Sequence, residues 1–254
     1  MKELETKLIG ASLAMSFFIL YISLSVSFNL FLIHETLTTL WVWLFIFVYG
    51  IISSFLIGWI RKKWKQAGVV TGFLLYIGFG YLIFIIMSPN EFGLIAGTVG
   101  AIFALIFLMG EKWAKRQRMA RAAYMLPVLA LCLTPFEWTN KEGWTEVRQG
   151  ETVLIQYEAF NGEHLIPIEA KAGEQLFFKV DHHFRDGGEH GVSLYDEEHN
   201  LRPMTEHPLE EGVLGVEPSE DSTYYIVIRG IAAKEGKVEV TWWQENKVVG
   251  TLDD

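Results

Sequence analysis

Residues 40–60 read LWVWLFIFVYGIISSFLIGWI, and the next five residues, 61–65, read RKKWK. The first stretch contains 21 residues and no Asp, Glu, Lys or Arg. A hydrocarbon core of about 30 Å is crossed by about 20 apolar residues in helical form. The stretch therefore predicts a transmembrane helix that is followed by a basic cluster.

Three further stretches on either side have the same character and also lack ionised side chains, namely residues 8–33, 67–87 and 92–109. The first of them is too long for a cleaved signal peptide, and no small-residue cleavage site follows it. Residues 1–136 therefore predict a bundle of at least four transmembrane helices.

A fifth apolar stretch, residues 122–136, is shorter and contains two prolines. About 15 residues in a helix cover only about 22 Å, which makes a crossing marginal. The basic run KRQRMAR at 115–121 precedes it, as in an internal signal sequence. We expect this stretch to cross the membrane; the alternative is a buried or interfacial helix.

The distribution of basic residues predicts the orientation. Lys and Arg cluster in two of the connecting segments, 61–65 and 112–121, whereas the connections after the first and third stretches contain none. Lys- and Arg-rich loops stay in the cytoplasm. We therefore expect a multi-pass protein of the cell membrane with a cytoplasmic N-terminus. If the fifth stretch crosses, the C-terminal domain lies outside the cytoplasm.

Residues 137–254 have a different composition. They contain 10 Lys and Arg against 25 Asp and Glu, whereas residues 1–136 contain 11 against 5. This change marks a domain boundary, and the acidic half would repel nucleic acid. The chain has one cysteine, Cys132, so no intrachain disulfide can form. An extracytoplasmic domain without disulfides indicates a bacterial envelope.

Short runs of β-branched and aromatic residues with partial alternation fill this half, which predicts seven or eight short strands. Gly-containing turn signals separate them at 161–163, 171–174, 186–191 and 233–236. We expect an all-β domain, a β-sandwich with a jelly-roll or immunoglobulin-like layout.

Three elements of this half resemble the bacterial pre-peptidase C-terminal domain: an A-G-E turn at 172–174, L-Y-D at 194–196 and T-Y-Y at 223–225. The sequence departs from that family at Ser222, where the family has glycine, and at Glu198 and Asn200 in the turn after Asp196. The resemblance covers about 80 residues. It implies an accessory β-module and not an enzyme.

Five of the seven histidines fall between residues 182 and 207, interspersed with carboxylates. Imidazole and carboxylate groups are the usual protein ligands of Zn²⁺ and Cu²⁺. The residues that could form such a site are Asp181, His182, His183, His190 and His199. The alternatives are exposed polar loops at the rim of the sandwich, or a pH sensor. No HExxH or calcium-loop spacing is present.

Trp242 and Trp243 are candidate ligand-binding residues, because an exposed indole beside acidic groups is typical of sugar-binding faces. The alternative places one ring in the core and the other as a cap. No nucleophile elbow, Ser-x-x-Lys motif or P-loop is present, so no catalytic residue is proposed.

We therefore expect a non-catalytic membrane protein that displays its β-domain as a binding or sensing module. Its partners would be the lipid bilayer and a cell-envelope glycan, a metal ion or another membrane protein. Two alternatives stay open: a component of a transport or efflux system, marked by a polar cavity between the third and fourth stretches, and a metal-dependent envelope enzyme.

Overall fold

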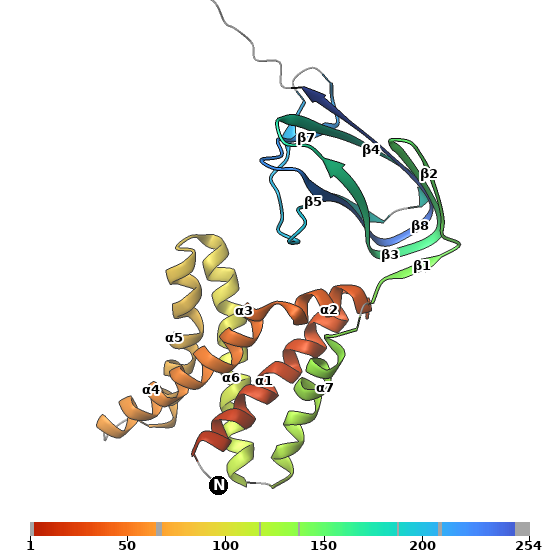
Figure 1. Ribbon diagram of the computed structural model, residues 1–254. Coiled ribbons are helices and arrows are strands. Elements are labelled where there is room, and N and C mark those ends of the chain that lie inside the picture. Colours follow the sequence, from red (N-terminus) through yellow and green to blue (C-terminus); the bar gives the residue numbers. More distant parts are fainter. Residues whose placement is uncertain are drawn as a thin grey trace, which may run out of the picture. The chain divides into compact units, whose positions relative to one another are not determined.

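The computed structural model describes residues 3–64, 68–116, 118–136, 138–186, 188–207 and 210–246. Contacts divide the chain into two compact units, residues 1–137 and 138–254. The first unit is helical and the second is an antiparallel β-domain (Figure 1). This is the architecture that the sequence predicts.

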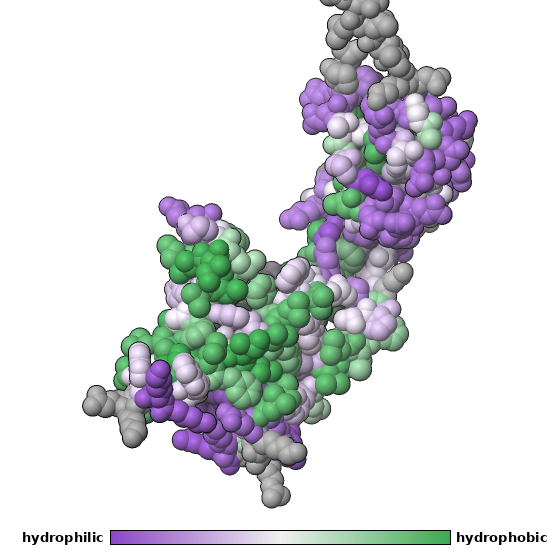
Figure 2. Space-filling view, turned by 60° about the vertical axis from the view of Figure 1, so that its left-hand side comes forward, coloured by the Kyte–Doolittle hydropathy of each residue, from purple (hydrophilic) through white to green (hydrophobic). Residues whose placement is uncertain are grey.

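The helical unit contains four segments that are long and apolar enough to cross a membrane: Glu3–Ser25, Leu40–Lys63, Val69–Met87 and Glu91–Arg116. This identifies a membrane protein. Apolar residues cover the flanks of the unit in Figure 2, and hydrophilic residues gather at its lower end in that view. The helices are α1 (Glu3–Ser25), α2 (Leu30–Thr38), α3 (Leu40–Trp43), the π-helix η1 (Leu44–Tyr49), α4 (Gly50–Lys63), α5 (Val69–Met87), α6 (Glu91–Arg116), the 3₁₀-helix η2 (Arg118–Tyr124) and α7 (Met125–Leu133).

The expected single span over residues 8–33 is wrong. α1 ends at Ser25, and Ser27 and Phe28 adopt positive φ angles of 51° and 60°. Asn29 then caps α2, because its side-chain oxygen accepts hydrogen bonds from the amides of Phe31 and Leu32 at 3.1 and 3.3 Å. A capping residue inside an apolar run thus ends one helix and starts another.

The glycines of α5 and α6 allow these two helices to pack closely. A Cβ atom on Gly80 would lie 2.6 Å from Ala101 Cα, and one on Gly100 would lie 2.4 Å from the Gly80 carbonyl oxygen. Small residues permit such backbone approach between membrane helices. Gly78 differs, since it faces open space and has no packing role.

The segment formed by η2 and α7 runs beside α1 (Figure 1). At its start, Arg121 Nη2 lies 2.8 Å from Glu5 Oε1 near the beginning of α1. At its end, the Thr134 carbonyl oxygen lies 2.8 Å from His34 Nε2 in α2, beyond the other end of α1. The segment therefore extends along the whole of α1.

The β-domain consists of one antiparallel sheet that folds back on itself (Figure 1). Strand β8 pairs along its length with β3, from Ser222 opposite Ala170 to Thr241 opposite Thr152. Its other edge pairs with β5 near its start and with β4 near its end. The strands are β1 (Asn140–Glu142), β2 (Thr145–Gln149), β3 (Thr152–Ala170), β4 (Glu174–Asp186), β5 (Glu189–Tyr195), β6 (Thr205–Glu206), β7 (Val213–Val216) and β8 (Ser222–Asn246).

Two of the expected turns are bends within long strands, so the expected separate short strands there are wrong. Gly162, with φ 137°, bends the 19-residue strand β3 where the register shifts. Ala232 and Glu235, with φ 52° and 45°, bend the 25-residue strand β8 beside it. The bends let each strand contribute to both walls of the sandwich. The expected turn at 171–174 is present, with Gly173 at φ 79°.

Side chains on the inner faces of both walls form one apolar core. Its fully buried members include Ile155 and Phe160 of β3, Phe178 of β4, and Ile226 and Val240 of β8. They come from both sides of the bends, which explains why the two walls stay closed on each other.

Candidate functional site

A buried polar cluster joins four helices of the helical unit. Lys7 of α1 and Glu111 of α6 form an ion pair, with Lys7 Nζ 2.8 Å from Glu111 Oε1. Ser54 of α4 hydrogen-bonds to both partners, and the Tyr76 hydroxyl of α5 donates to Glu111 Oε2 at 2.9 Å. All four side chains are buried.

Both charges of this cluster lie just outside the expected apolar stretches. Lys7 precedes the first stretch, which begins at Leu8, and belongs to α1. Glu111 follows the fourth stretch, which ends at Met109, and belongs to α6. The apolar stretches themselves contain no ionised side chain, but the helices as they fold extend past them and include Lys7 and Glu111. A buried charge in a membrane helix requires a partner, and it commonly marks a functional position. Here the hydroxyls of Ser54 and Tyr76 complete the hydrogen bonding of the carboxylate.

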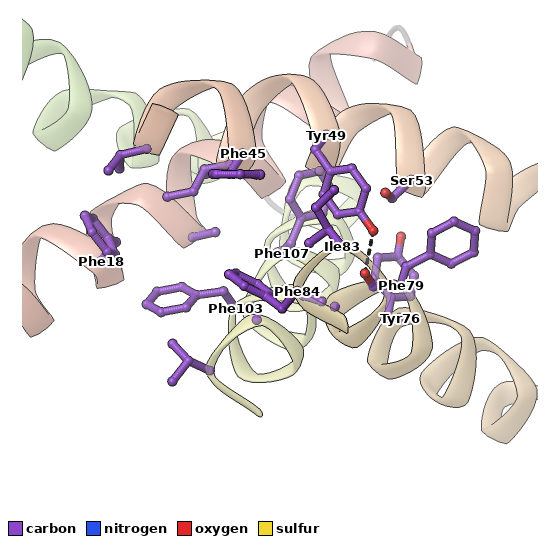
Figure 3. Close-up of a pocket in the computed structure, with 18 of the residues that line it drawn as sticks. Phe18, Phe45, Tyr49, Ser53, Tyr76, Phe79, Ile83, Phe84, Phe103 and Phe107 are labelled. Atoms are coloured by element: carbon purple, nitrogen blue, oxygen red, sulfur yellow. Dashed lines mark hydrogen bonds between the residues drawn. The ribbon is translucent and has the colours of Figure 1, made fainter. Parts of the chain in front are cut away.

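A cavity of about 210 Å³ lies next to this cluster, between α1, η1, α4, α5 and α6. Phenylalanine rings dominate its wall, and Figure 3 shows Phe45, Tyr49 and Ser53 opposite residues of α5 and α6. Tyr76 belongs both to the wall and to the polar cluster. The described lining residues are Ala14, Phe18, Val42, Phe45, Ile46, Tyr49, Gly50, Ser53, Ile57, Tyr76, Phe79, Gly80, Ile83, Phe84, Val99, Gly100, Phe103, Ala104 and Phe107.

The β-domain carries an open polar groove of about 650 Å³. Thr145, Gln156, Lys237 and His183 lie in register across the adjacent strands β2, β3, β8 and β4, and all four line it. Residues directly opposite in register share one face of a sheet, so the four form a row. The other described lining residues are Gly143, Tyr157, Glu158, Glu235 and Gly236.

The five predicted metal ligands fall into separate places. Asp181 is exposed on β4 and lies 3.8 Å from Lys179, and His183 lies in the groove. His199, at φ 61°, stacks on Tyr225 with 5.4 Å between ring centroids. Only His182 and His190, among these described residues, approach each other, with ring centroids 5.1 Å apart.

Within the described ranges, no group of three or more His, Cys, Asp or Glu side chains is placed to hold a metal ion. Binding of Zn²⁺ or Cu²⁺ at these residues thus stays a prediction without an assembled ligand set. Burial lowers the pKa of His182, and the neighbouring His190 adds to this effect.

The two candidate tryptophans separate into core and surface, as the alternative interpretation of the sequence has it. Trp242 is buried in the core of the sandwich. Trp243 is half-buried on the opposite face, where its Nε1 donates to Glu245 Oε1 at 3.0 Å and its ring lies 5.9 Å from that of Phe177. Trp243 is therefore the one of the two that a ligand can reach.

A second histidine environment was not apparent from the sequence. The His164 ring packs edge-on against Trp144, 4.8 Å between centroids, and its Nδ1 lies 2.8 Å from Lys141 Nζ. Its Nε2 lies 2.9 Å from Glu146 Oε2, without the geometry of a hydrogen bond. Burial first, and Lys141 second, lower the pKa of His164, while Glu146 opposes them.

Sequence reasoning missed the polar cluster and the groove. The signal for the cluster was available in part, since Ser54 and Tyr76 are hydroxyl residues within apolar stretches. The row in the groove depends on strand register across four strands, which a single sequence does not specify.

No family model matches the chain, and neither the curated proteins nor the solved structures contain a match.

Proposed function

We propose that this chain is a multi-pass protein of a bacterial cell membrane that displays its β-domain outside the cytoplasm as a binding or sensing module. The observation that carries the proposal is the course of the fifth segment, which runs beside α1 from Glu5, near the start of α1, to His34 in α2.

The length of the fifth segment supports a crossing. Seven residues of η2 at about 2.0 Å each and nine residues of α7 at about 1.5 Å each give about 28 Å, close to a hydrocarbon core of about 30 Å. The 3₁₀ turns thus lengthen a segment that would be short as an α-helix. Because α1 is itself long enough to span, its close neighbour crosses the same thickness of membrane.

The basic residues support the orientation. Arg61, Lys62 and Lys63 lie in the last turn of α4, and Lys115 and Arg116 lie in the last turn of α6. Both ends stay on the cytoplasmic side under the positive-inside rule. With five crossings, the chain enters the β-domain on the other side.

The polar groove supports a binding role for the β-domain. Its row of Gln156, Lys237 and His183 offers an amide, an ammonium group and an imidazole, and Glu158 adds a carboxylate. Such a surface suits a small polar ligand with several hydrogen-bonding groups, for example a piece of envelope glycan. Trp243, on the same domain, is available for stacking against a sugar ring.

A transport component is the second candidate, and the buried Lys7–Glu111 pair favours it. The feature that would mark this function is a polar cavity between α5 and α6. The cavity described there is apolar instead, and its lining contains no Asp, Glu, Lys, Arg or His among the described residues. The binding module therefore fits the geometry better.

Cysteine accessibility tests the orientation. In a Cys132→Ser background, Glu198→Cys lies in the exposed turn after β5, and Arg116→Cys lies at the end of α6. We expect a membrane-impermeant maleimide to label Glu198→Cys in intact cells and Arg116→Cys only after lysis. The reverse pattern would place the β-domain in the cytoplasm and reject the proposal.

A further inference from the structure

The cavity of the helical unit is larger than a simple packing defect. A dry apolar cavity of about 150 Å³ in a protein core accommodates a benzene molecule. At about 210 Å³, this cavity has room for a ring or for a short length of hydrocarbon chain. Packed protein interiors contain few voids of this size, which indicates that the cavity has a role other than packing.

Three hydroxyl groups line the cavity, those of Tyr49, Ser53 and Tyr76 (Figure 3). Two of them are satisfied within the protein. The Tyr49 hydroxyl donates to the Phe79 carbonyl oxygen at 2.5 Å, and the Tyr76 hydroxyl donates to Glu111 Oε2 at 2.9 Å. Ser53 Oγ lies near the Tyr49 hydroxyl but forms no hydrogen bond of good geometry in the described part of the chain, although only 6% of the residue is exposed. A buried hydroxyl is costly unless some group bonds to it.

The cavity is also accessible from the flank of the helical unit. Val99 of α6 is part of its wall and is 40% exposed. On the opposite wall, Phe45, Ile46 and Tyr49 lie on the π-helix η1, whose wider turn interrupts the regular helix at this point. Such π segments within α-helices occur frequently at functional sites.

From these observations we propose that the cavity binds a neutral lipid from the bilayer, with an apolar ring or chain between the phenylalanines and a hydroxyl or carbonyl group on Ser53. The ligand is neutral because the described lining offers no charged side chain, and Lys7 and Glu111 already neutralise each other. This site is distinct from the groove of the β-domain, and the inference does not depend on the proposed function.

Photocrosslinking of the full chain in phosphatidylcholine vesicles tests the inference. The probe is hexadecanol with a diazirine in its chain and a terminal alkyne, and the matched probe is the hexadecane with the same groups. We expect adducts of the alcohol to concentrate on residues 42–57, 76–84 and 99–107. Ser53→Ala should reduce alcohol adducts about three- to tenfold, the value of one hydrogen bond, and leave the hydrocarbon probe unchanged.

Two further measurements distinguish binding in the cavity from general labelling by probes in the membrane. Ala104→Leu fills the cavity and should reduce adducts of both probes, whereas Ala96→Leu, on the same helix and outside the lining, should not. In the unaltered protein, excess hexadecanol should compete with the labelled alcohol better than hexadecane does. Equal labelling by the two probes, equal competition, or adducts spread over the lipid-facing surface would overturn the inference.

Discussion

At the scale of single residues, the Lys7–Glu111 pair is the most consequential contact of the helical unit. Its two charges come from residues that are 104 positions apart, and the hydroxyls of Ser54 and Tyr76 surround them. A buried ion pair adds little stability compared with apolar side chains of the same size, but the loss of one partner is severe.

Glu111→Ala should therefore destabilise the protein by about 3–5 kcal/mol, because Lys7 would keep a buried charge without its partner. Chemical denaturation in detergent micelles measures this free energy. Adding Lys7→Met to Glu111→Ala should restore most of the loss, since both charges are then gone. As a control, Glu3→Ala at the exposed start of α1 should have little effect. Equal losses in the single and double variants would contradict the assignment.

Two histidines predict how the β-domain responds to acid. The pKa of His164 and that of His182 are both lowered, mainly by burial. Below about pH 6.5, the unfolded chain therefore binds more protons at these sites than the folded domain does. The stability of the domain should be full above that pH and should fall as the pH drops through it.

Thermal unfolding of the full chain at pH 8 and pH 5, followed by near-ultraviolet circular dichroism, measures this effect. His164→Gln combined with His182→Gln should flatten the pH profile. His199→Gln, on an exposed loop, serves as the matched control and should leave the profile unchanged. An unaltered profile in the double variant would count against the two buried imidazoles as its source.

At the scale of elements, the bends of the long strands are decisive for the β-domain. Gly162 combines a φ of 137° with a position where a Cβ atom would lie 2.5 Å from Thr139 Oγ1. Only glycine adopts this backbone conformation without strain. The bend places the two halves of β3 in opposite walls of the sandwich.

Gly162→Ala should destabilise the β-domain by about 1–3 kcal/mol, because the substitution adds backbone strain and a steric clash. Thermal unfolding of the full chain, followed by the near-ultraviolet signal of the tryptophans, measures the change. Gly191→Ala is the control, since no atom lies within 4 Å of a Cβ atom there. If both variants unfold at the same temperature as the unaltered chain, the bend does not require glycine.

At the scale of the whole molecule, the side of the membrane on which the β-domain lies depends on one short segment in the proposed topology. The segment of η2 and α7 is the last apolar element before the domain, and Leu129 in its middle is 53% exposed. A charged residue at the centre of a spanning helix costs about 2.5–3.5 kcal/mol on insertion.

Leu129→Arg should therefore prevent the fifth crossing and retain the β-domain in the cytoplasm. An alkaline phosphatase fusion after residue 246 should lose its activity, and a green fluorescent protein fusion at the same place should become bright. Leu129→Phe, which stays apolar, should behave as the unaltered chain does. Persistent phosphatase activity in Leu129→Arg would show that the position of the β-domain does not depend on a crossing by this segment.

The sequence by itself determined the two-part architecture. Lipid excludes charge, so the long uncharged stretches had to form spanning helices, and alternating apolar residues had to form strands around a core.

Only the tertiary structure decided where polar groups meet. Lys7, Ser54, Tyr76 and Glu111 lie on four helices, and no local pattern relates them. The predicted histidine cluster was divided, with His182 and His183 on opposite sides of β4 and His199 on a loop, because neighbours on a strand point to opposite sides. Residues near in sequence were separated and distant ones were joined, since helix packing and strand register depend on the whole chain.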